Sequence, residues 1–229
     1  MVASLQIRLG SCGVADEWRK EAARAGAWRT RESCLREGSP VVELTARTMK
    51  DARSFTCTET LRNGLAVTIR AMRPDDRDRV AGAVGKLDRH SVYSRLFSNR
   101  TELTDAALSR IMTVDPDHDM ALLVTTGSGL EEIVIGSGRY ITAGDQGAER
   151  TAEVAFVVEE NHRRLGIASR LLSHLADIAR RRGIVAFEAD VLAGNQSMLA
   201  VFARSGMPMR KRRDGGVVHI TLSLGPGRP

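Results

Sequence analysis

The segment from Glu153 to Leu172 reads EVAFVVEENHRRLGIASRLL and holds the most informative pattern in the chain. Its first part is rich in β-branched and aromatic residues, which predicts a strand. Its second part has apolar residues at helical spacing and predicts an amphipathic helix over 166–182. The connecting loop delivers its residues to the start of that helix. Because a helix start exposes N–H groups without intrahelical acceptors and carries partial positive charge, this unit can bind a phosphate group.

The loop has the composition that close approach of an anion requires. Gly166 and Ala168 have little or no side chain, so an anion can reach the backbone, and Arg163 and Arg164 add positive charge. An ordinary strand-to-helix connection with solvated arginines has the same local pattern. The elements on either side of the loop therefore decide between the two interpretations.

Those elements follow a definite order. A strand over 66–72 precedes Arg73-Pro74-Asp75-Asp76, where the proline ends the strand and the aspartates suit a helix start. We expect two short helices next, a third over 105–114, strands over 119–125, 133–142 and 151–159, a helix over 166–182, a strand over 185–192, a helix over 196–205 and a hairpin that ends with 217–224. This order predicts an α/β protein with a mixed sheet, and it excludes an all-α or doubly wound fold.

In this order of elements the chain resembles the GNAT superfamily of acyl-CoA-dependent N-acyltransferases over residues 61–224. Arg163, Gly166 and Ala168 match its signature Q/R-x-x-G-x-G/A. The resemblance implies a GNAT-type, mostly antiparallel sheet flanked by helices and splayed between its fourth and fifth strands, here 151–159 and 185–192. The chain is also similar to the acyltransferase domain of bacterial Pat-type protein-lysine acetyltransferases, at Arg73–Asp76, at Ser91–Phe97 and at Ala152–Phe156.

The resemblance implies that acetyl-CoA is the cosubstrate and indicates which residues hold it. The pantetheine arm would pair with the backbone of Phe156, Val157 and Val158 like an added strand, and a bulge near Val157 would polarise the thioester carbonyl. Asn195 would either contact coenzyme A or only cap the helix that follows it. The pyrophosphate would lie against the loop and first helical turn, at Arg163, Arg164, Gly166, Ile167, Ala168 and Ser169.

Acetylation of a lysine also requires a base, because the lysine side-chain amine has a pKa of about 10.4 and is almost entirely protonated at neutral pH. Glu153 is the first candidate, since it lies on the strand beside the expected thioester among apolar residues that raise a carboxyl pKa. The alternative is an outward-facing glutamate in a salt bridge. Glu188 and Asp190, on the next strand of the cleft, are the second choices.

Other polar and aromatic residues receive structural interpretations. The position at which the family often carries a general-acid tyrosine is Phe202, which cannot donate a proton and is expected to pack in the core. Three histidines, His162, His174 and His219, are expected to be structural. No nucleophile with a neighbouring base is visible, which favours direct transfer in a ternary complex over a covalent acyl-enzyme.

Composition limits the remaining possibilities. The chain has 229 residues and a net charge of +6, with 34 lysines and arginines spread along it and clustered at 180–182 and 210–213. Such clusters attract an anionic partner or form a solvated face, so nucleic-acid binding stays a weaker alternative. Cys12, Cys34 and Cys57 follow no metal-binding spacing, so neither a disulfide framework nor a metal site is expected.

The sequence also gives expectations for location and organisation. It has no apolar run of the roughly 18 residues that a membrane span needs and no signal peptide, so we expect a cytoplasmic monomer or homodimer without a membrane partner. Residues 1–55 lack sustained periodicity and are interpreted as an appendage, which leaves 56–229 as the acyltransferase domain. Besides the weaker alternative of nucleic-acid binding, three functions remain: acetylation of a protein lysine, acetylation of a small amine, and non-catalytic binding of acyl-CoA.

Overall fold

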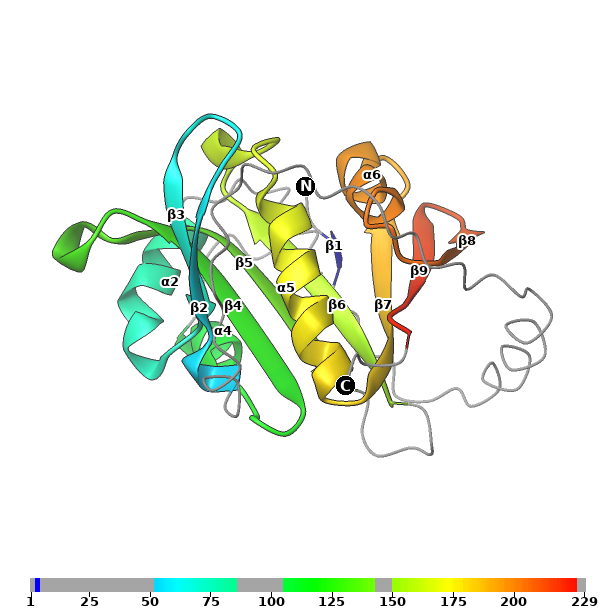
Figure 1. The fold of residues 1–229 in the computed structure, drawn as a ribbon, viewed down its shortest axis with the longest axis horizontal. Coiled ribbons are helices and arrows are strands. Elements are labelled where there is room, and N and C mark those ends of the chain that lie inside the picture. The colour runs from blue at the N-terminus through cyan, green and yellow to red at the C-terminus, as the bar shows by residue number, and fades with distance from the viewer. Residues whose placement is uncertain (1–2, 5–51, 86–104, 143–149, 226–229) are drawn as a thin grey trace, which may run out of the picture. The chain divides into compact units, whose positions relative to one another are not determined.

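The computed structural model describes residues 3–4, 52–85, 105–142 and 150–225, and in these residues the chain forms one mixed sheet (Figure 1). The strand order is β2-β3-β4-β5-β6-β7-β9-β8. All neighbours are antiparallel except β6 and β7, which are parallel. The strands are β2 (Thr56–Thr60), β3 (Ala66–Ala71), β4 (Asp119–Thr126), β5 (Ile133–Thr142), β6 (Arg150–Val158), β7 (Ile184–Leu192), β8 (Met209–Asp214) and β9 (Val217–Ser223).

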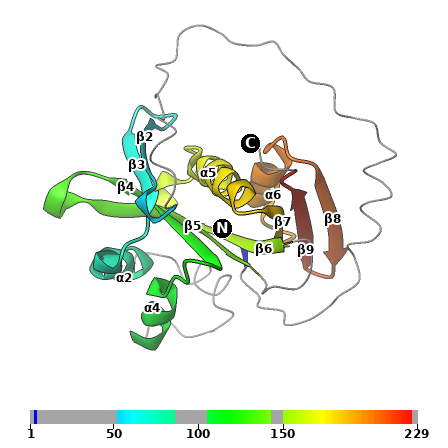
Figure 2. The same ribbon diagram turned by 60° about the horizontal axis from the view of Figure 1, so that its bottom comes forward.

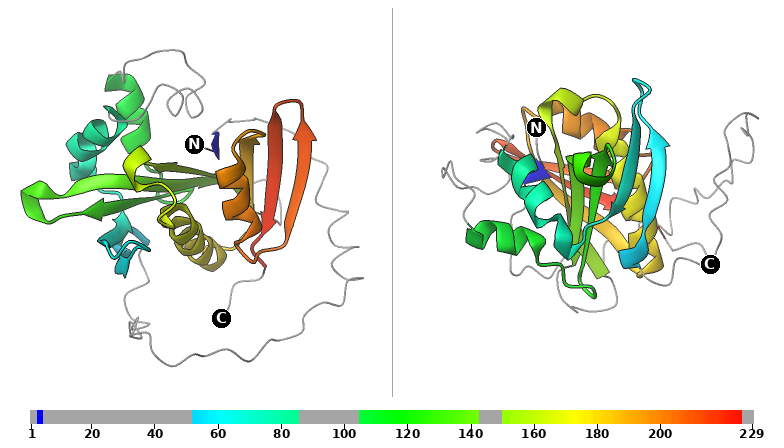
Figure 3. Two further views of the ribbon diagram at one scale, coloured as in Figure 1. Left: turned by 90° about the horizontal axis from the view of Figure 1, so that it is seen from above. Right: turned by 90° about the vertical axis from the view of Figure 1, so that its left-hand side faces the viewer.

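Helices cover both faces of this sheet, as Figures 2 and 3 show. One face carries α5 (Ile167–Arg181) and α6 (Gln196–Ala203), and the other carries α2 (Arg77–Gly85) and α4 (Asp105–Met112). Four short 3-10 turns connect the elements, η1 (Ala52–Ser54), η2 (Pro74–Asp76), η3 (Gly129–Glu131) and η4 (Glu160–His162). The sheet therefore has a different helical cover on each side.

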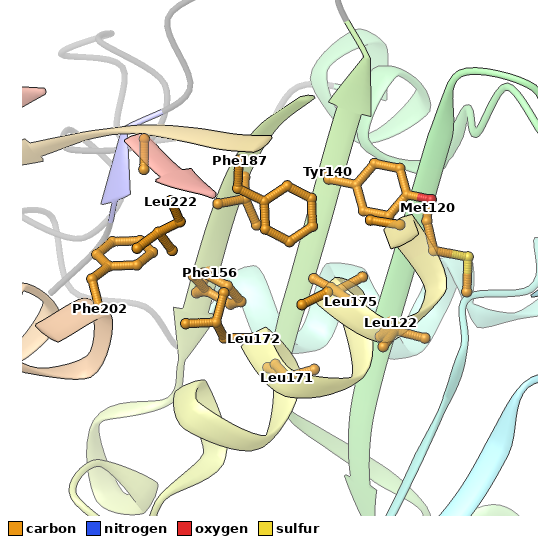
Figure 4. Packing of buried hydrophobic residues seen from close by; sticks show 14 of the residues in the cluster. Met120, Leu122, Tyr140, Phe156, Leu171, Leu172, Leu175, Phe187, Phe202 and Leu222 are labelled. Carbon is orange, nitrogen blue, oxygen red and sulfur yellow. The ribbon is translucent and has the colours of Figure 1, made fainter. Parts of the chain in front are cut away.

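The larger core lies under α5. Its helical stripe of Leu171, Leu172 and Leu175 is almost completely buried against Phe156 and Phe187 of the sheet (Figure 4). Burying a leucine or phenylalanine side chain contributes about 1.5–3 kcal/mol each, so this stripe fixes α5 across strands on both sides of the β6–β7 junction. A second, smaller cluster joins α2 and α4 to β4 and β5.

A buried ion pair fixes the start of α2. The Arg70 guanidinium on β3 donates to both carboxylate oxygens of Asp76, at 2.7 Å each, and Asp76 also accepts from the Arg73 backbone N–H at 2.8 Å. Burial disfavours ionisation of Asp76, but these hydrogen bonds and the positive charges of Arg70 and Arg79 outweigh it, so the pKa of Asp76 lies below its usual value. The Arg73–Asp76 motif is thus a structural connection between β3 and α2.

Strands β6 and β7 pair only along part of their length. Arg150 to Glu153 pair with residues 184 to 188 of β7, and the pairing ends at Glu153 opposite Glu188. The rest of β6, Val154 to Val158, pairs with β5 alone among the strands of the ordered path. A two-residue strand, β1 (Ala3–Ser4), pairs antiparallel with β7 at Val191 and Asp190, beyond the point where β6 leaves.

The fold class predicted from the sequence is confirmed, including the opening between the fourth and fifth predicted strands. Two expectations were wrong. The segment Thr56–Thr60 is a strand, β2, where no strand was expected. The pairing of β5 with β6 runs without a register shift through Val157, so no bulge interrupts this ladder there. The expected helix around Ser91–Phe97 lies outside the described residues.

Candidate active site

The predicted phosphate loop adopts a backbone that presents donors at the start of α5. Arg164 has φ 63°, a left-handed value, and Gly166 follows with φ 94° and ψ 4°. Gly166 takes the N-cap position but has no side chain, so no side-chain oxygen caps the helix. The first turn also has no acidic residue. The free N–H groups and the positive end of the helix dipole are therefore left for an external anion.

The residues of the first turn of α5 differ in how far they are exposed to solvent. Ile167 is buried in the core, and its Cγ2 comes so close to Gly136 of β5 that a Cβ there would lie only 2.9 Å away. Ala168 is half-buried and Ser169 is exposed. Ile167 can offer only its backbone to a phosphate, whereas Ser169 can also offer its hydroxyl group.

Four arginines surround the loop, and the sequence indicated only two of them. Arg164 is exposed, and Arg163 pairs with Glu160 at 2.8 Å. Arg62, in the β2–β3 turn, donates its backbone N–H to the Leu165 carbonyl, which places that turn beside the loop. A Cβ at Gly166 would lie 2.8 Å from Nη1 of Arg170 and 3.7 Å from Nε of Arg62. Neither was predicted, because Arg62 belongs to a distant turn in the sequence and Arg170 lies outside the loop motif, within α5.

The predicted wall for the pantetheine arm is the part of β6 that has left β7. The side chains of Phe156 and Val157 are buried, on opposite faces of the sheet, and Val158 is half-buried. Only their backbone can therefore pair with an extended ligand in the opening. From Glu153 to Val158 the strand covers roughly 17 Å at about 3.3 Å per residue, and it leads directly into the phosphate loop.

Carboxylates gather at the closed end of the opening. Ala152 and Val154 face the core under α5, so Glu153 between them faces the other side of the sheet. Its register partner Glu188 shares that face, and Asp190 follows two residues further along β7. We call Glu153, Glu188 and Asp190 the acidic face. All three candidate bases thus lie side by side on the face opposite α5.

The members of the acidic face differ in their surroundings. Burial, and then the negative charge of Asp190, raise the pKa of Glu188, although part of its side chain reaches solvent. Asp190 pairs with Nδ1 of His219, its register partner on β9. His219 was interpreted from the sequence as structural, and the structure gives it a specific carboxylate partner on the wall of the cleft. Asp190 therefore lies between Glu188, two residues away on β7, and His219, its partner on β9.

Two further predicted residues have defined structural roles. Asn195 is buried, and its Oδ1 accepts a hydrogen bond from the Met198 N–H at 2.9 Å, which makes it the N-cap of α6. The helix-capping alternative is thus observed, and contact with coenzyme A stays a prediction. Phe202 is completely buried, with its ring 6.2 Å from that of Phe156, as expected for a core residue.

The two basic clusters are not equivalent. Arg180 donates to the Leu224 carbonyl and pairs with Asp177, and Arg182 donates to the Asp119 carbonyl, so these side chains connect α5 to its surroundings. Residues 210–213 are exposed on β8, whose only partner among the described strands is β9. Charged side chains on an edge strand discourage pairing with another chain, which accounts for this second cluster without a ligand.

The architecture described above is that of an acyltransferase, with a sheet that opens beside an uncapped helix start. A profile of the acetyltransferase (GNAT) family matches residues 90–207. The chain therefore belongs to the acetyltransferase (GNAT) family, and the predicted enzyme class, an N-acetyltransferase that uses acetyl-CoA, is confirmed.

Individual relatives agree with this assignment. The chain is 28% identical over 140 residues to acetyltransferase PA5475 of Pseudomonas aeruginosa, which covers 61% of this chain and 74% of that protein. It is also 29% identical over 167 residues to acetyltransferase Pat of Mycolicibacterium smegmatis. This match covers 72% of the present chain but only 48%, about half, of Pat. The crystal structure of the GNAT domain of S. lividans PAT superposes with a TM-score of 0.64 and 31% identity, and covers 73% of this chain and 96% of that domain.

The described residues hold no helix that combines the length and the apolar character that crossing a bilayer requires.

Proposed function

We propose that this enzyme transfers the acetyl group of acetyl-CoA to the side-chain amine of a protein lysine, by direct attack within a ternary complex. The observation that carries the proposal is the end of β6–β7 pairing at Glu153. Beyond this point, the opening has a phosphate-binding loop at one end and the acidic face at the other. Similarity to two Pat proteins supports the lysine acceptor.

In this proposal each part of the site has one task. The loop at Gly166 and the arginines around it hold the pyrophosphate, and the backbone of Phe156 to Val158 holds the pantetheine arm. The thioester then lies toward Glu153. The amine nitrogen attacks the thioester carbonyl carbon, the C–S bond breaks, and coenzyme A leaves as a thiolate that takes up a proton.

Glu153 is the proposed base and accepts the proton that the amine must lose. Glu188 is its direct rival, because it lies opposite Glu153 and its pKa is raised. Replacing Glu153 with Gln keeps the shape but removes the proton acceptor, so kcat should fall about 10²- to 10⁴-fold with little change in acetyl-CoA affinity. The loss should shrink as pH rises, since more of the acceptor is then already neutral.

The proposal is tested by incubating the full chain with isotopically labelled acetyl-CoA and two acceptors, a lysine peptide with a blocked amino terminus and a mixture of small primary amines. Mass spectrometry should find the label on the peptide lysine. Label on the small amines alone would establish the second candidate, small-amine acetylation. Tight binding of acetyl-CoA without transfer to any acceptor, cell lysate proteins included, would favour a non-catalytic binding module.

Two controls make the assignment of the base and of the order of transfer specific. Glu188→Gln is the matched variant for Glu153→Gln, because the two residues are register partners on one face. If Glu188→Gln loses the rate and Glu153→Gln does not, the base is Glu188. Initial rates at varied concentrations of both substrates should give intersecting lines, and parallel lines would indicate a covalent acyl-enzyme instead.

A further inference from the structure

Three side chains of metal-binding type converge between β2 and α5, away from the acidic face. Cys57 and Glu59 alternate along β2, and both are half-buried, as is His174 of α5. The Nε2 atom of His174 lies 3.7 Å from Sγ of Cys57 and 2.5 Å from Oε1 of Glu59. One donor atom from each of the three residues lies within 4.8 Å of the other two.

The arrangement differs from that of a catalytic triad. In a triad the nucleophile and the acid bond to opposite ring nitrogens of the histidine, so a proton taken at one side is balanced at the other. Here Cys57 and Glu59 both face the same nitrogen, Nε2. His174 therefore cannot relay a proton between them. The donor atoms of Cys57, Glu59 and His174 lie close together, as the ligands of a bound metal ion do.

We propose that Cys57, Glu59 and His174 form a binding site for a divalent transition-metal ion of the zinc class. A thiolate, an imidazole and a carboxylate are the ligand types that Zn²⁺ prefers, and three protein ligands leave its fourth tetrahedral position for water. Half-burial of all three side chains leaves the site within reach of solvent. The site lies seven residues along α5 from Ile167, roughly 10 Å from the helix start. It shares one side chain with the phosphate loop, because Arg170 pairs with Glu59 and also lies beside Gly166.

The observed separations are close to those of a tetrahedral site. With about 2.3 Å for Zn–S and about 2.0 Å for Zn–N and Zn–O, neighbouring ligands lie roughly 3.3–3.6 Å apart. The Cys57–His174 distance of 3.7 Å already fits, whereas Glu59 must move away from His174 by less than about 1 Å. On binding, the ion replaces the thiol proton of Cys57, which leaves to solvent, and it takes the place of the direct His174–Glu59 contact.

Neighbouring groups orient the ligands. Arg170 pairs through Nε with the second carboxylate oxygen of Glu59 at 2.5 Å, and it donates from Nη2 to the Thr60 carbonyl at 2.6 Å. The Phe55 ring packs on the His174 ring with centroids 5.2 Å apart. Such outer contacts fix ligand orientation and commonly change metal affinity about 10- to 100-fold when removed. A metal here would join the β2 edge of the sheet to α5.

The test uses the full chain, stripped with chelator and titrated with CoCl₂ and with ZnCl₂. One equivalent of Co²⁺ should give visible bands of a tetrahedral ion and a near-ultraviolet thiolate-to-cobalt charge-transfer band, and Zn²⁺ should displace it. In parallel, Zn²⁺ should protect Cys57 from alkylation, as followed by peptide mapping, while Cys12 and Cys34 serve as internal controls. The alkylation arm needs no variant, so it stays informative even if a variant fails to fold.

Variants identify the ligands. Cys57→Ala and His174→Gln should each lower metal affinity at least tenfold and remove the charge-transfer or tetrahedral signature. His162→Gln is the matched control, because His162 also pairs with a glutamate, through Nδ1 with Glu159 at 2.7 Å, but is not among the three converging donors. The double variant Cys12→Ser/Cys34→Ser should bind as the wild type does. Absence of stoichiometric binding, a thiolate band that survives in Cys57→Ala, or alkylation of Cys57 that Zn²⁺ does not slow would each overturn the proposal.

Discussion

Gly166 offers the sharpest test of the phosphate loop, because its backbone requirement and its chemical role can be separated. At φ 94° a residue with a Cβ is strained, and left-handed backbone costs such a residue about 1–2 kcal/mol. The added Cβ would meet Nη1 of Arg170 at 2.8 Å, but this is the end of a flexible side chain and can move. Since about 1 kcal/mol corresponds to roughly 2–4 °C in a chain of this size, Gly166→Ala should lower Tm by roughly 2–8 °C.

Gly183 at the other end of α5 provides the matched control. It has φ 73°, and a Cβ there would have nothing within 4 Å, so Gly183→Ala carries the same kind of strain without touching the loop. Both alanine variants should lose similar stability in calorimetry. Only the change at Gly166 should weaken coenzyme A binding.

Gly166→Asp adds the electrostatic part of the test. Its carboxylate would stand where the pyrophosphate is expected and would compete for Arg62 and Arg170, so Kd for coenzyme A should rise more than tenfold, or roughly 1.4 kcal/mol. Isothermal titration calorimetry on the folded variant measures this directly. If folded Gly166→Asp binds coenzyme A as tightly as Gly183→Ala does, the pyrophosphate does not bind at this loop.

Three further outcomes are expected. Asp76→Ala should destabilise the protein by about 3–5 kcal/mol in urea unfolding, because it leaves the buried Arg70 charge without its main partner, and a loss below about 1 kcal/mol would contradict this. Glu188→Gln should raise Tm at pH 7 but not near pH 4: a raised carboxyl pKa means that the folded state favours the protonated form, so the wild type loses stability as pH rises through that pKa. Deleting residues 1–51 removes β1, but this strand has only two residues paired with β7, so folding and turnover on a small acceptor should stay nearly intact. A folded truncation without activity would place that segment in the active site.

Local patterns made much of the fold predictable. The apolar strand β6 and the stripe of α5 are recognisable within twenty residues, and Gly166 marks the start of the helix both in the sequence and in the structure. Strand β2 was missed because Thr56–Thr60 contains no large apolar residue, and its inward positions are Cys57 and Glu59. Their partner His174 lies 115 or more residues away in sequence, so no spacing rule connects them.

Only the part of the candidate site that is contiguous in sequence could be predicted from a local pattern. Residues 163–169 are contiguous, so the loop motif identified them together. Arg62 reaches the loop from another turn, and His219 reaches Asp190 through the pairing of β9 with β7. That Glu188 lies opposite Glu153 depends on the register of two strands more than thirty residues apart. Register between distant strands is set by the whole sheet, which a motif does not contain.

The partial pairing of β6 with β7 also affects how the two halves of the sheet are held together. In the part of the chain that the structure describes, the ordered strands form two groups, β2–β6 and β7–β9, and β6 and β7 pair with each other only at Arg150–Glu153, while β1 pairs with β7 beyond that point. The two groups of strands are held together by the core beneath α5, where Phe156 and Phe187 are buried and the ring of Phe202 packs near that of Phe156 (Figure 4). The width of the opening between β6 and β7 therefore depends on the volume of the core beneath α5, and a smaller side chain at 187 or 202 should change that width.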